Sequence, residues 1–225
     1  MNKEKFYVAY GNNEAITSYS VFIKKVLHQY DVEIIDIRTS KYFPNLIIFT
    51  GGEDVNPDRY SQRTGKYTHI NSKRDSIEEN VFFNYLDVPK LGICRGSQFL
   101  TVMNGGTLIQ HVENHANGPH TISFLNEHRG LVVELPSTHH QMMYPFDMKD
   151  SKYELIAYSS NFRSGVYLNG KDEQIKITPN FLEPEVVFYP NSNSLAVQPH
   201  PEIADRQSTG FKVIAQIIIN KLIKK

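Results

Sequence analysis

The sequence predicts an α/β fold with a mostly parallel central sheet flanked by helices, plus a β-rich and irregular C-terminal half. In the first part of the 225-residue chain, short apolar runs alternate with stretches of helical periodicity, as expected for parallel strands joined by helices. From His120 onward, short strand-like segments are broken by Gly, Pro and Asn. With 40% hydrophobic residues the chain can bury one substantial core, so we expect residues 1–225 to form a single domain.

The first part contains four apolar runs rich in β-branched or aromatic residues, which is typical of strands buried on both faces of a sheet. These runs are residues 6–9, 32–37, 46–50 and 90–93. Apolar residues at helical spacing predict one helix between the first two strands and another between the third and fourth. They are Tyr19, Phe22, Ile23, Val26 and Tyr30 in the first helix and Ile77, Val81, Phe82 and Tyr85 in the second.

The second part is expected to contain short strands and to close with a helix. The strand-like segments are residues 121–124, 131–135, 155–159, 186–189 and 195–198. The helix is indicated by an apolar stripe made of Phe211, Val213, Ile214, Ile217, Ile218 and Leu222. Basic residues follow this stripe and complement the negative end of the helix dipole.

Charge and composition exclude several classes of partner. Lys+Arg and Asp+Glu both total 24, so the net charge is zero and no basic face is expected for nucleic acid or an anionic membrane. No apolar run approaches the ~18 residues of a membrane span, and the first is too short for a signal peptide. A lone cysteine suits a reducing compartment. We therefore expect a cytoplasmic protein.

That cysteine, Cys94, lies in a segment typical of a catalytic nucleophile. Residues 92–96 read Gly-Ile-Cys-Arg-Gly, directly after a predicted strand and before a helical segment through Phe99 and Leu100. Flanking glycines let the backbone reverse sharply, which exposes the side chain at the carboxyl edge of the sheet. The helix N-terminus beneath it is expected to lower the pKa of the thiol. The alternative is a small buried cysteine in a glycine-flanked turn.

A cysteine that transfers an acyl group also needs hydrogen-bond donors for the developing oxyanion. Thr50-Gly51-Gly52 ends the preceding strand at the same edge of the sheet, and paired glycines leave backbone N–H groups accessible. We predict an oxyanion hole made by the amides of Gly52 and Arg95, with Gly51 permitting the loop geometry. The alternative is an ordinary glycine turn.

The thiol needs a base as well. Residues 198–202 read Gln-Pro-His-Pro-Glu and follow a strand-like segment. Two prolines fix the backbone around His200, which can aim its imidazole at the thiol, while Glu202 can orient the ring. A lone histidine in a proline-rich loop is otherwise a solvated loop residue.

These segments resemble the class I glutamine amidotransferases, and within them the γ-glutamyl hydrolase branch of peptidase C26 type, which includes γ-glutamyl-γ-aminobutyrate hydrolases. The resemblance rests on Gly-x-Cys-x-Gly-x-Gln, on His-Pro-Glu, on residues 51–57 with Tyr60, on Arg74-Asp75 and on Ser-Thr-His-His-Gln at 137–141. It implies a flavodoxin-like sheet, a Cys94-His200-Glu202 triad and no cofactor or metal. It also implies a substrate site that includes Gly51, Gln98, Ser137, Thr138, His139, His140 and Gln141.

The sequence departs from the family at two places near the base. Pro199 stands where family members usually have tryptophan, and the chain has no tryptophan. Pro199 removes a backbone donor and a large packing group, which puts the geometry of His200 in question. Thr138 stands where the family often has leucine. Residues 161–190 carry no motif that can be aligned, so substrate choice is expected to lie there.

We therefore predict hydrolysis of a γ-glutamyl amide, either glutamine or a γ-glutamyl-amine conjugate, through a γ-glutamyl thioester. One alternative is a glutaminase subunit that delivers ammonia to a separate synthase, its partner. Another is a catalytically inert binding domain on the same fold. A third is metal-dependent hydrolysis, since His111 and His115 have the i, i+4 spacing of zinc ligands on a helix. The glutamate between them is not at the His-Glu-x-x-His position, so no metal is expected.

Overall fold

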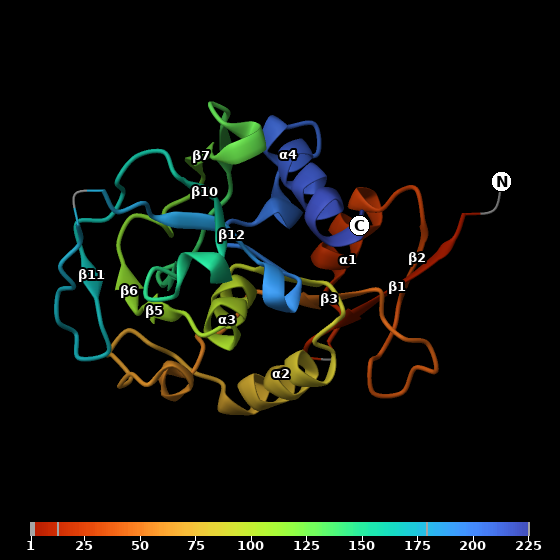
Figure 1. Ribbon diagram of the computed structural model, residues 1–225, viewed down its shortest axis with the longest axis horizontal. Helices are drawn as coiled ribbons and strands as arrows, with labels where there is room; N and C mark the ends of the chain where they lie inside the picture. The colour runs from red at the N-terminus through yellow and green to blue at the C-terminus, as the bar shows by residue number, and fades with distance from the viewer. Residues whose placement is uncertain (1–2, 13, 179, 225) are drawn as a thin grey trace.

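The computed structural model describes residues 3–12, 14–178 and 180–224. Its centre is a nine-stranded sheet with the order β2-β1-β3-β4-β13-β12-β10-β7-β8 (Figure 1). The strands of this sheet are β1 (Lys5–Tyr10), β2 (Asp31–Ile34), β3 (Leu46–Phe49), β4 (Lys90–Ile93), β7 (His120–Phe124), β8 (Val132–Leu135), β10 (Glu154–Ser159), β12 (Pro184–Tyr189) and β13 (Ser194–Val197). Two small sheets pair β5 (Thr107–Ile109) with β9 (Met142–Tyr144) and β6 (His111–Val112) with β11 (Tyr167–Leu168).

The sheet has a parallel half and an antiparallel half. β2, β1, β3, β4 and β13 pair in parallel, whereas β13, β12, β10, β7 and β8 pair antiparallel. The parallel half therefore has the strand order 2-1-3-4-5 of a flavodoxin-like fold, in which ligands bind at the carboxyl ends of the strands. The antiparallel half is the β-rich C-terminal part. The predicted α/β fold is confirmed.

Helices cover both faces of the parallel half. They are α1 (Thr17–Val26), α2 (Ser72–Asn84), α3 (Arg95–Met103) and α4 (Thr209–Ile218), and a π-helical turn (Ile219–Ile223) continues α4. α1 and α4 pack in one buried cluster and α2 and α3 in another, on opposite sides of the sheet (Figure 1). Five 3-10 turns lie at Pro57–Tyr60, Asn126–His128, Asp150–Lys152, Pro190–Ser192 and Pro201–Ile203.

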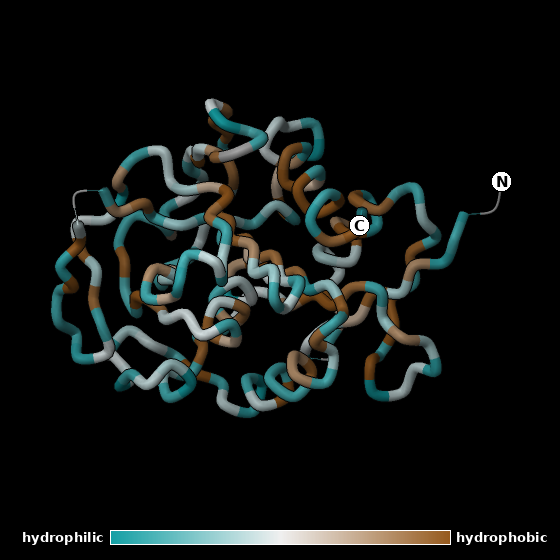
Figure 2. Tube along the Cα trace, in the orientation of Figure 1, coloured by the Kyte–Doolittle hydropathy of each residue, from teal (hydrophilic) through white to brown (hydrophobic). Residues whose placement is uncertain are grey.

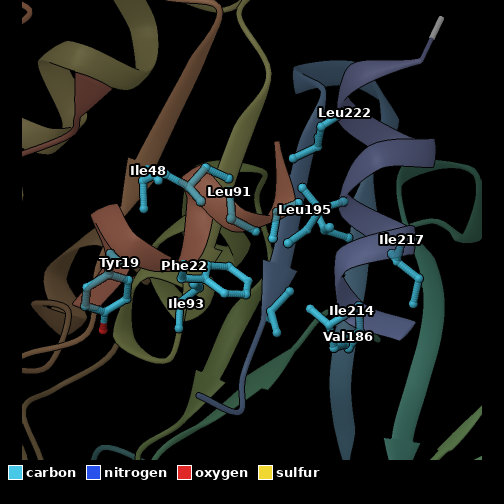
Figure 3. Close-up of a cluster of buried hydrophobic side chains, with 14 of the residues drawn as sticks. Tyr19, Phe22, Ile48, Leu91, Ile93, Val186, Leu195, Ile214, Ile217 and Leu222 are labelled. Atoms are coloured by element: carbon cyan, nitrogen blue, oxygen red, sulfur yellow. The ribbon is translucent and has the colours of Figure 1, made fainter. Parts of the chain in front are cut away.

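The alternating directions of side chains along the buried strands explain why the sheet has one hydrophobic cluster on each face. On β1, Val8 faces α1 and α4 while Ala9 faces α2 and α3, because successive side chains of a strand point to opposite faces. In Figure 3, Phe22 of α1 and Ile214 of α4 lie against the strand residue Leu195. Figure 2 shows the hydrophobic stretches gathered on the central strands and on the inward sides of the helices. This packing fixes the carboxyl edge at which the candidate site lies.

Sequence periodicity missed the shortest elements. β5, β6, β9 and β11 have two or three residues each, too few for a period of two to be recognised. No helix in the described residues is long and apolar enough to cross a membrane.

Candidate active site

Cys94 lies in a tight turn between β4 and α3. Its φ of 53° and ψ of −112° fall in a region that non-glycine residues rarely adopt, and its amide donates to the Val197 carbonyl at 2.9 Å. Close packing makes glycine necessary nearby: a Cβ on Gly96 would lie 2.0 Å from the Phe49 carbonyl oxygen. The sheet thus holds the start of α3 against β3 and keeps Cys94 in this strained conformation.

The Gly51-Gly52 turn forms one wall beside the cysteine. A Cβ on Gly51 would lie 3.7 Å from Cβ of Cys94 and 3.4 Å from Cε1 of His200, so Gly51 adjoins both side chains. Gly52 has a φ of 139°, which favours glycine. Among the described residues, neither the Gly52 N–H nor the Arg95 N–H has a hydrogen-bond partner. Both amides are therefore available as donors to a ligand.

Arg74 holds this turn from the other side. Its guanidinium donates to the Gly51 carbonyl at 3.0 Å and to the Thr50 carbonyl at 2.9 Å, and its Nε donates to Glu78 at 3.1 Å. In a trans peptide the N–H points opposite to the C=O. Because Arg74 binds the Gly51 carbonyl, the Gly52 N–H is directed away from Arg74. In the sequence, Arg74 was part of a family-like motif to which no role was assigned.

The Arg95 side chain points into the interior. It is 2% exposed and forms ion pairs with the buried carboxylates of Asp75 and Glu78, while its Nε donates to the Glu53 carbonyl at 3.1 Å. This buried pairing links α2 to the first turn of α3. Of Arg95, only the backbone amide is available at the site.

His200 and Glu202 are brought together by the Pro201–Ile203 turn. Nδ1 of His200 lies 2.6 Å from Oε1 of Glu202, and the two side chains are 12% and 3% exposed. Although Pro199 supplies no N–H, it is buried, and the His200 amide is anchored by donating to the Pro136 carbonyl at 2.8 Å. On its other side, Nε2 of His200 lies 2.8 Å from the Thr138 hydroxyl.

The Cys94 side chain lies beside the imidazole, since both adjoin Gly51. Burial by itself lowers the pKa of His200, but the hydrogen bonds and charges of Cys94 and Glu202 outweigh burial and raise it from 6.5 to about 10. His200 is therefore a cation at neutral pH. A protonated imidazole beside a sulfur nucleophile is the state that can donate a proton to a leaving amine.

Tyr19 of α1 completes the wall, a role that the sequence did not reveal. Its hydroxyl accepts a hydrogen bond from the Gly51 amide at 3.1 Å. Burial, and then the negative charge of Glu202, raise the pKa of Tyr19 well above its usual value. Tyr19 thus lies between the glycine turn and the acid of the His200–Glu202 pair. Its apolar spacing in α1 predicted only a core position.

The predicted substrate loop, residues 137–141, has inward and outward side chains. Ser137, His139 and Gln141 are buried: the Ser137 hydroxyl donates to the His115 carbonyl at 2.7 Å, and the Gln141 amide donates to the Thr68 hydroxyl at 3.0 Å. Thr138 faces His200. The side chain of His140 is 38% exposed and lies 3.2 Å from Asp54.

Gln98 lies behind the cysteine on α3. It is 3% exposed, and its Nε2 donates to the Gln141 carbonyl at 3.1 Å and to the Gln198 side chain at 3.4 Å. It therefore ties the substrate loop and the end of β13 to the helix that carries Cys94.

The helical arrangement considered for His111 and His115 is wrong. His111 lies on strand β6 and stacks on Tyr67 with a centroid distance of 4.0 Å, and no helix joins it to His115. The chain turns after β6 and carries His115 into the interior, where it meets His120, His139 and Glu185. These four buried residues are the group in the described chain that can hold a metal ion.

Comparison with known proteins connects this geometry to a family. A family model described as Peptidase C26 matches residues 4–151. A Schizosaccharomyces pombe protein provisionally named a glutamine amidotransferase is 30% identical over 186 residues, covering 79% of this chain and 70% of that protein. A Rickettsia prowazekii protein provisionally named glutamine amidotransferase-like is 42% identical over 73 residues. That match covers 31% of this chain and about a quarter (26%) of the relative.

Solved structures support the fold. A Thermoplasma acidophilum protein provisionally named a GMP synthase subunit matches with a TM-score of 0.61 at 18% identity, covering 99% of this chain and 95% of that one. A chain of PurLQS from Thermotoga maritima matches with a TM-score of 0.57 at 16% identity, with coverages of 98% and 99%. Taken with the family match and the S. pombe relative, these findings show that the chain belongs to the Peptidase C26 family of the class I glutamine amidotransferase-like superfamily.

Proposed function

We propose that this chain hydrolyses a γ-glutamyl amide bond, with Cys94 as nucleophile, His200 as general acid and base, and Glu202 as the residue that orients His200. The observation that supports this most strongly is the His200–Glu202 pair, with its atoms 2.6 Å apart, placed beside the Cys94 side chain. This pair lies beside the Gly51-Gly52 turn, where the Gly52 and Arg95 amides have no hydrogen-bond partner among the described residues. A nucleophile, a base and an orienting acid in this order are the parts that acyl transfer requires.

The proposed reaction begins when the Cys94 sulfur attacks the γ-carbonyl carbon. The N–H groups of Gly52 and Arg95 stabilise the oxyanion that forms, a contribution of about 3–4 kcal/mol per donor in comparable enzymes. His200 donates its Nε2 proton to the leaving amine, which departs and leaves a γ-glutamyl thioester. Neutral His200 then takes a proton from water, the hydroxide attacks the thioester, and glutamate is released as the Cys94 thiolate and protonated His200 are restored.

The predicted substrate-binding residues divide by the groups that their side chains contact. Thr138 and His140 are the outward residues of the 137–141 loop, so we propose that they contact the substrate. Ser137, His139, Gln141 and Gln98 bind protein groups, so in this proposal they hold the loop in place and shape the pocket from behind. Gly51 supplies space beside the thiol. The pKa of His140 is raised, first by its hydrogen bond to Asp54, which favours a cation that can attract a carboxylate.

The second candidate is a glutaminase that passes ammonia to a separate synthase. Two structural relatives support it: one is named as part of a GMP synthase, and the other belongs to PurLQS. Both resemblances are at the level of fold. The family model instead favours a peptidase-type hydrolase.

The decisive experiment measures glutamate release from a panel of γ-glutamyl amides by the purified chain alone. The panel pairs glutamine with γ-glutamyl conjugates of a neutral amine, a diamine and an amino acid, and α-glutamyl isomers serve as controls. We expect turnover of at least one γ-glutamyl compound and none of the α-isomers. Turnover of glutamine alone, at a rate that rises when a candidate synthase is added, identifies the ammonia-donating glutaminase. Failure to cleave any compound, with or without such a partner, contradicts the proposal and leaves a binding domain.

A further inference from the structure

A second histidine-rich centre lies behind the substrate loop. His115, His120, His139 and Glu185 each place one ligand atom within 4.8 Å of the others, and all four residues are buried. They come from the segment after β6, from β7, from the 137–141 loop and from β12. None is part of the proposed Cys94 chemistry.

The cluster leaves many polar atoms unpaired. Five of the twelve buried side-chain atoms that have no hydrogen-bond partner among the described residues belong to it: Nδ1 and Nε2 of His115, Nδ1 of His120, Nε2 of His139 and Oε2 of Glu185. Burying a polar atom without a partner costs about 1–3 kcal/mol, and more for a charged one. Such a concentration in one place indicates a missing partner.

The tautomer of His139 indicates what that partner is. Nδ1 of His139 lies 2.8 Å from the Gln141 carbonyl oxygen, which only accepts hydrogen bonds, so Nδ1 carries a proton. In the neutral ring Nε2 then has a lone pair, and it lies 3.9 Å from Oε2 of Glu185. Two lone-pair donors therefore face each other, an arrangement that a cation between them would satisfy.

We infer that His115, His120, His139 and Glu185 bind one divalent transition-metal ion, and that Zn²⁺ is the ion whose ligand preferences they fit. Zinc takes imidazole nitrogen and carboxylate oxygen at about 2.0–2.2 Å in tetrahedral sites. Tetrahedral ligands at that distance lie about 3.3 Å apart. The four ligand atoms now lie within 4.8 Å of one another, so metal binding requires side-chain rotations that close them to this spacing. Four protein ligands and complete burial describe a closed, structural site.

The surroundings also resemble those of metal-bound histidines. Nε2 of His115 lies 3.3 Å from Oε2 of Glu183, while its Nδ1 lies 3.5 Å from Glu185. Glu183 is itself held by the Tyr167 hydroxyl at 2.6 Å and by the Arg163 amide at 3.1 Å. Glu183 beside His115 and the Gln141 carbonyl beside His139 fix the orientation of these two rings. Residues that hydrogen-bond the ligands of zinc sites have the same effect.

A proton on His115 is the rival to a metal. Burial favours the neutral ring, but the nearby carboxylates of Glu183 and Glu185 outweigh burial and raise the pKa of His115 to about 9 in the metal-free chain. Either cation neutralises the buried carboxylates. Only the metal also binds the lone pair of His139, so the two interpretations differ in metal content.

The position of the centre gives the metal a role in the fold. His139 is the neighbour of Thr138, which contacts His200, and Ser137 is bonded to the His115 carbonyl. A metal would therefore fix the 137–141 loop to β7 and β12. It would hold the wall of the proposed active site without contacting the substrate.

The test uses the full chain carrying a tag without histidine, expressed with added zinc, gel-filtered and analysed by mass spectrometry for metal. We expect about one Zn²⁺ per chain, the content of a closed four-ligand site. Glu185→Gln and His139→Gln should lose it, and Glu183→Gln should bind about 10–100-fold more weakly. His111→Gln, a matched histidine outside the cluster, should keep it. Cys94→Ala should also keep it, which separates this inference from the proposed hydrolase activity.

A second measurement uses the wild-type chain alone, in case the cluster variants fail to fold. After chelation, Co²⁺ should produce the intense visible bands of a tetrahedral ion, and Zn²⁺ should abolish them and raise the melting temperature. The inference is overturned if the wild-type chain purifies without metal, binds no Co²⁺ and has the same melting temperature with Zn²⁺ as with a chelator. Retention of zinc by folded Glu185→Gln and His139→Gln overturns it equally.

Discussion

The His200–Glu202 pair and the buried cluster of His115, His120, His139 and Glu185 use the same two residue types in different surroundings. The pair lies at the carboxyl edge of the parallel half, 12% and 3% exposed, with a thiol as the third group. The cluster lies among antiparallel strands, sealed from solvent, with further imidazoles as its third and fourth groups. The His200–Glu202 pair, which is accessible to a substrate, is suited to proton transfer. The fully buried cluster is suited to binding a metal ion.

The two centres are connected by short contacts. The Gln198 amide, at the end of β13, donates to the Glu185 carbonyl at 2.8 Å, and Gln98 joins the Gln141 carbonyl to the Gln198 side chain. Variants in each centre therefore show whether the catalytic activity and the stability of the fold can be changed separately.

The largest effect is expected from Cys94→Ala. Removal of the proposed nucleophile should lower kcat for γ-glutamyl amide hydrolysis at least about 10⁴-fold, as loss of a triad nucleophile does in comparable enzymes. The metal content should stay that of the wild type. Glutamate release is the measurement. Equal activity of the variant and the wild type would remove Cys94 from the mechanism.

Glu202→Gln should have the next largest effect. The amide cannot stabilise an imidazolium and can select the wrong tautomer of His200, so kcat should fall about 10²–10⁴-fold. Loss of one contribution to the raised pKa of His200 should also move the alkaline limb of the kcat–pH profile to lower pH. A variant that retains the wild-type rate and profile contradicts the role given to Glu202.

Glu185→Gln is the matched substitution in the buried cluster. It leaves three imidazoles without their carboxylate and should lower the free energy of unfolding by about 3 kcal/mol. Urea unfolding at pH 7 measures this. Hydrolysis by the remaining folded protein should fall far less than in Glu202→Gln. If the two carboxylate variants lose stability and activity in the same proportion, the two centres do not divide these roles.

The smallest effect concerns pH and stability. The pKa of His200 is raised from 6.5 to about 10, so its stabilising contribution is fully present below pH 6.5 and is lost as pH rises through 10. Between these values the free energy of unfolding of the wild type should therefore fall relative to that of Glu202→Gln. The difference between the two proteins cancels the contribution of His115, whose pKa is also raised in the metal-free chain. A difference that is constant over this range would contradict the contribution of Glu202 to the raised pKa of His200.

Much of the candidate site was predictable because its determinants are local in sequence. Gly96 must be glycine because α3 packs on β3, and the spacing of His200 and Glu202 places an acid on the ring within one turn. Such patterns can be recognised in a single sequence, because they depend on steric limits and on residues that are close along the chain. The apolar runs that became β1, β3 and β4 are similarly local.

The roles of Arg74, Tyr19 and the His115 cluster were not predictable in this way. Arg74 acts on a turn 23 residues away, and Tyr19 on one 32 residues away. Their contacts exist only because α1 and α2 dock on opposite faces of the sheet. The 137–141 loop was predicted as one substrate-lining segment, but it has no regular period that tells which side chains point inward.

Residue patterns alone predict an α/β chain of this family, with Cys94 in a glycine turn and an imidazole–carboxylate pair at residues 200–202. Hydrophobic periodicity, the steric requirement for glycine and short-range residue spacing are sufficient to predict these features. Only the tertiary structure decided that Thr138 contacts His200, that Arg74 directs the Gly52 amide and that His115, His120, His139 and Glu185 converge. Convergence of distant side chains depends on how strands pair and helices dock, and charge and burial then decide what each histidine can do.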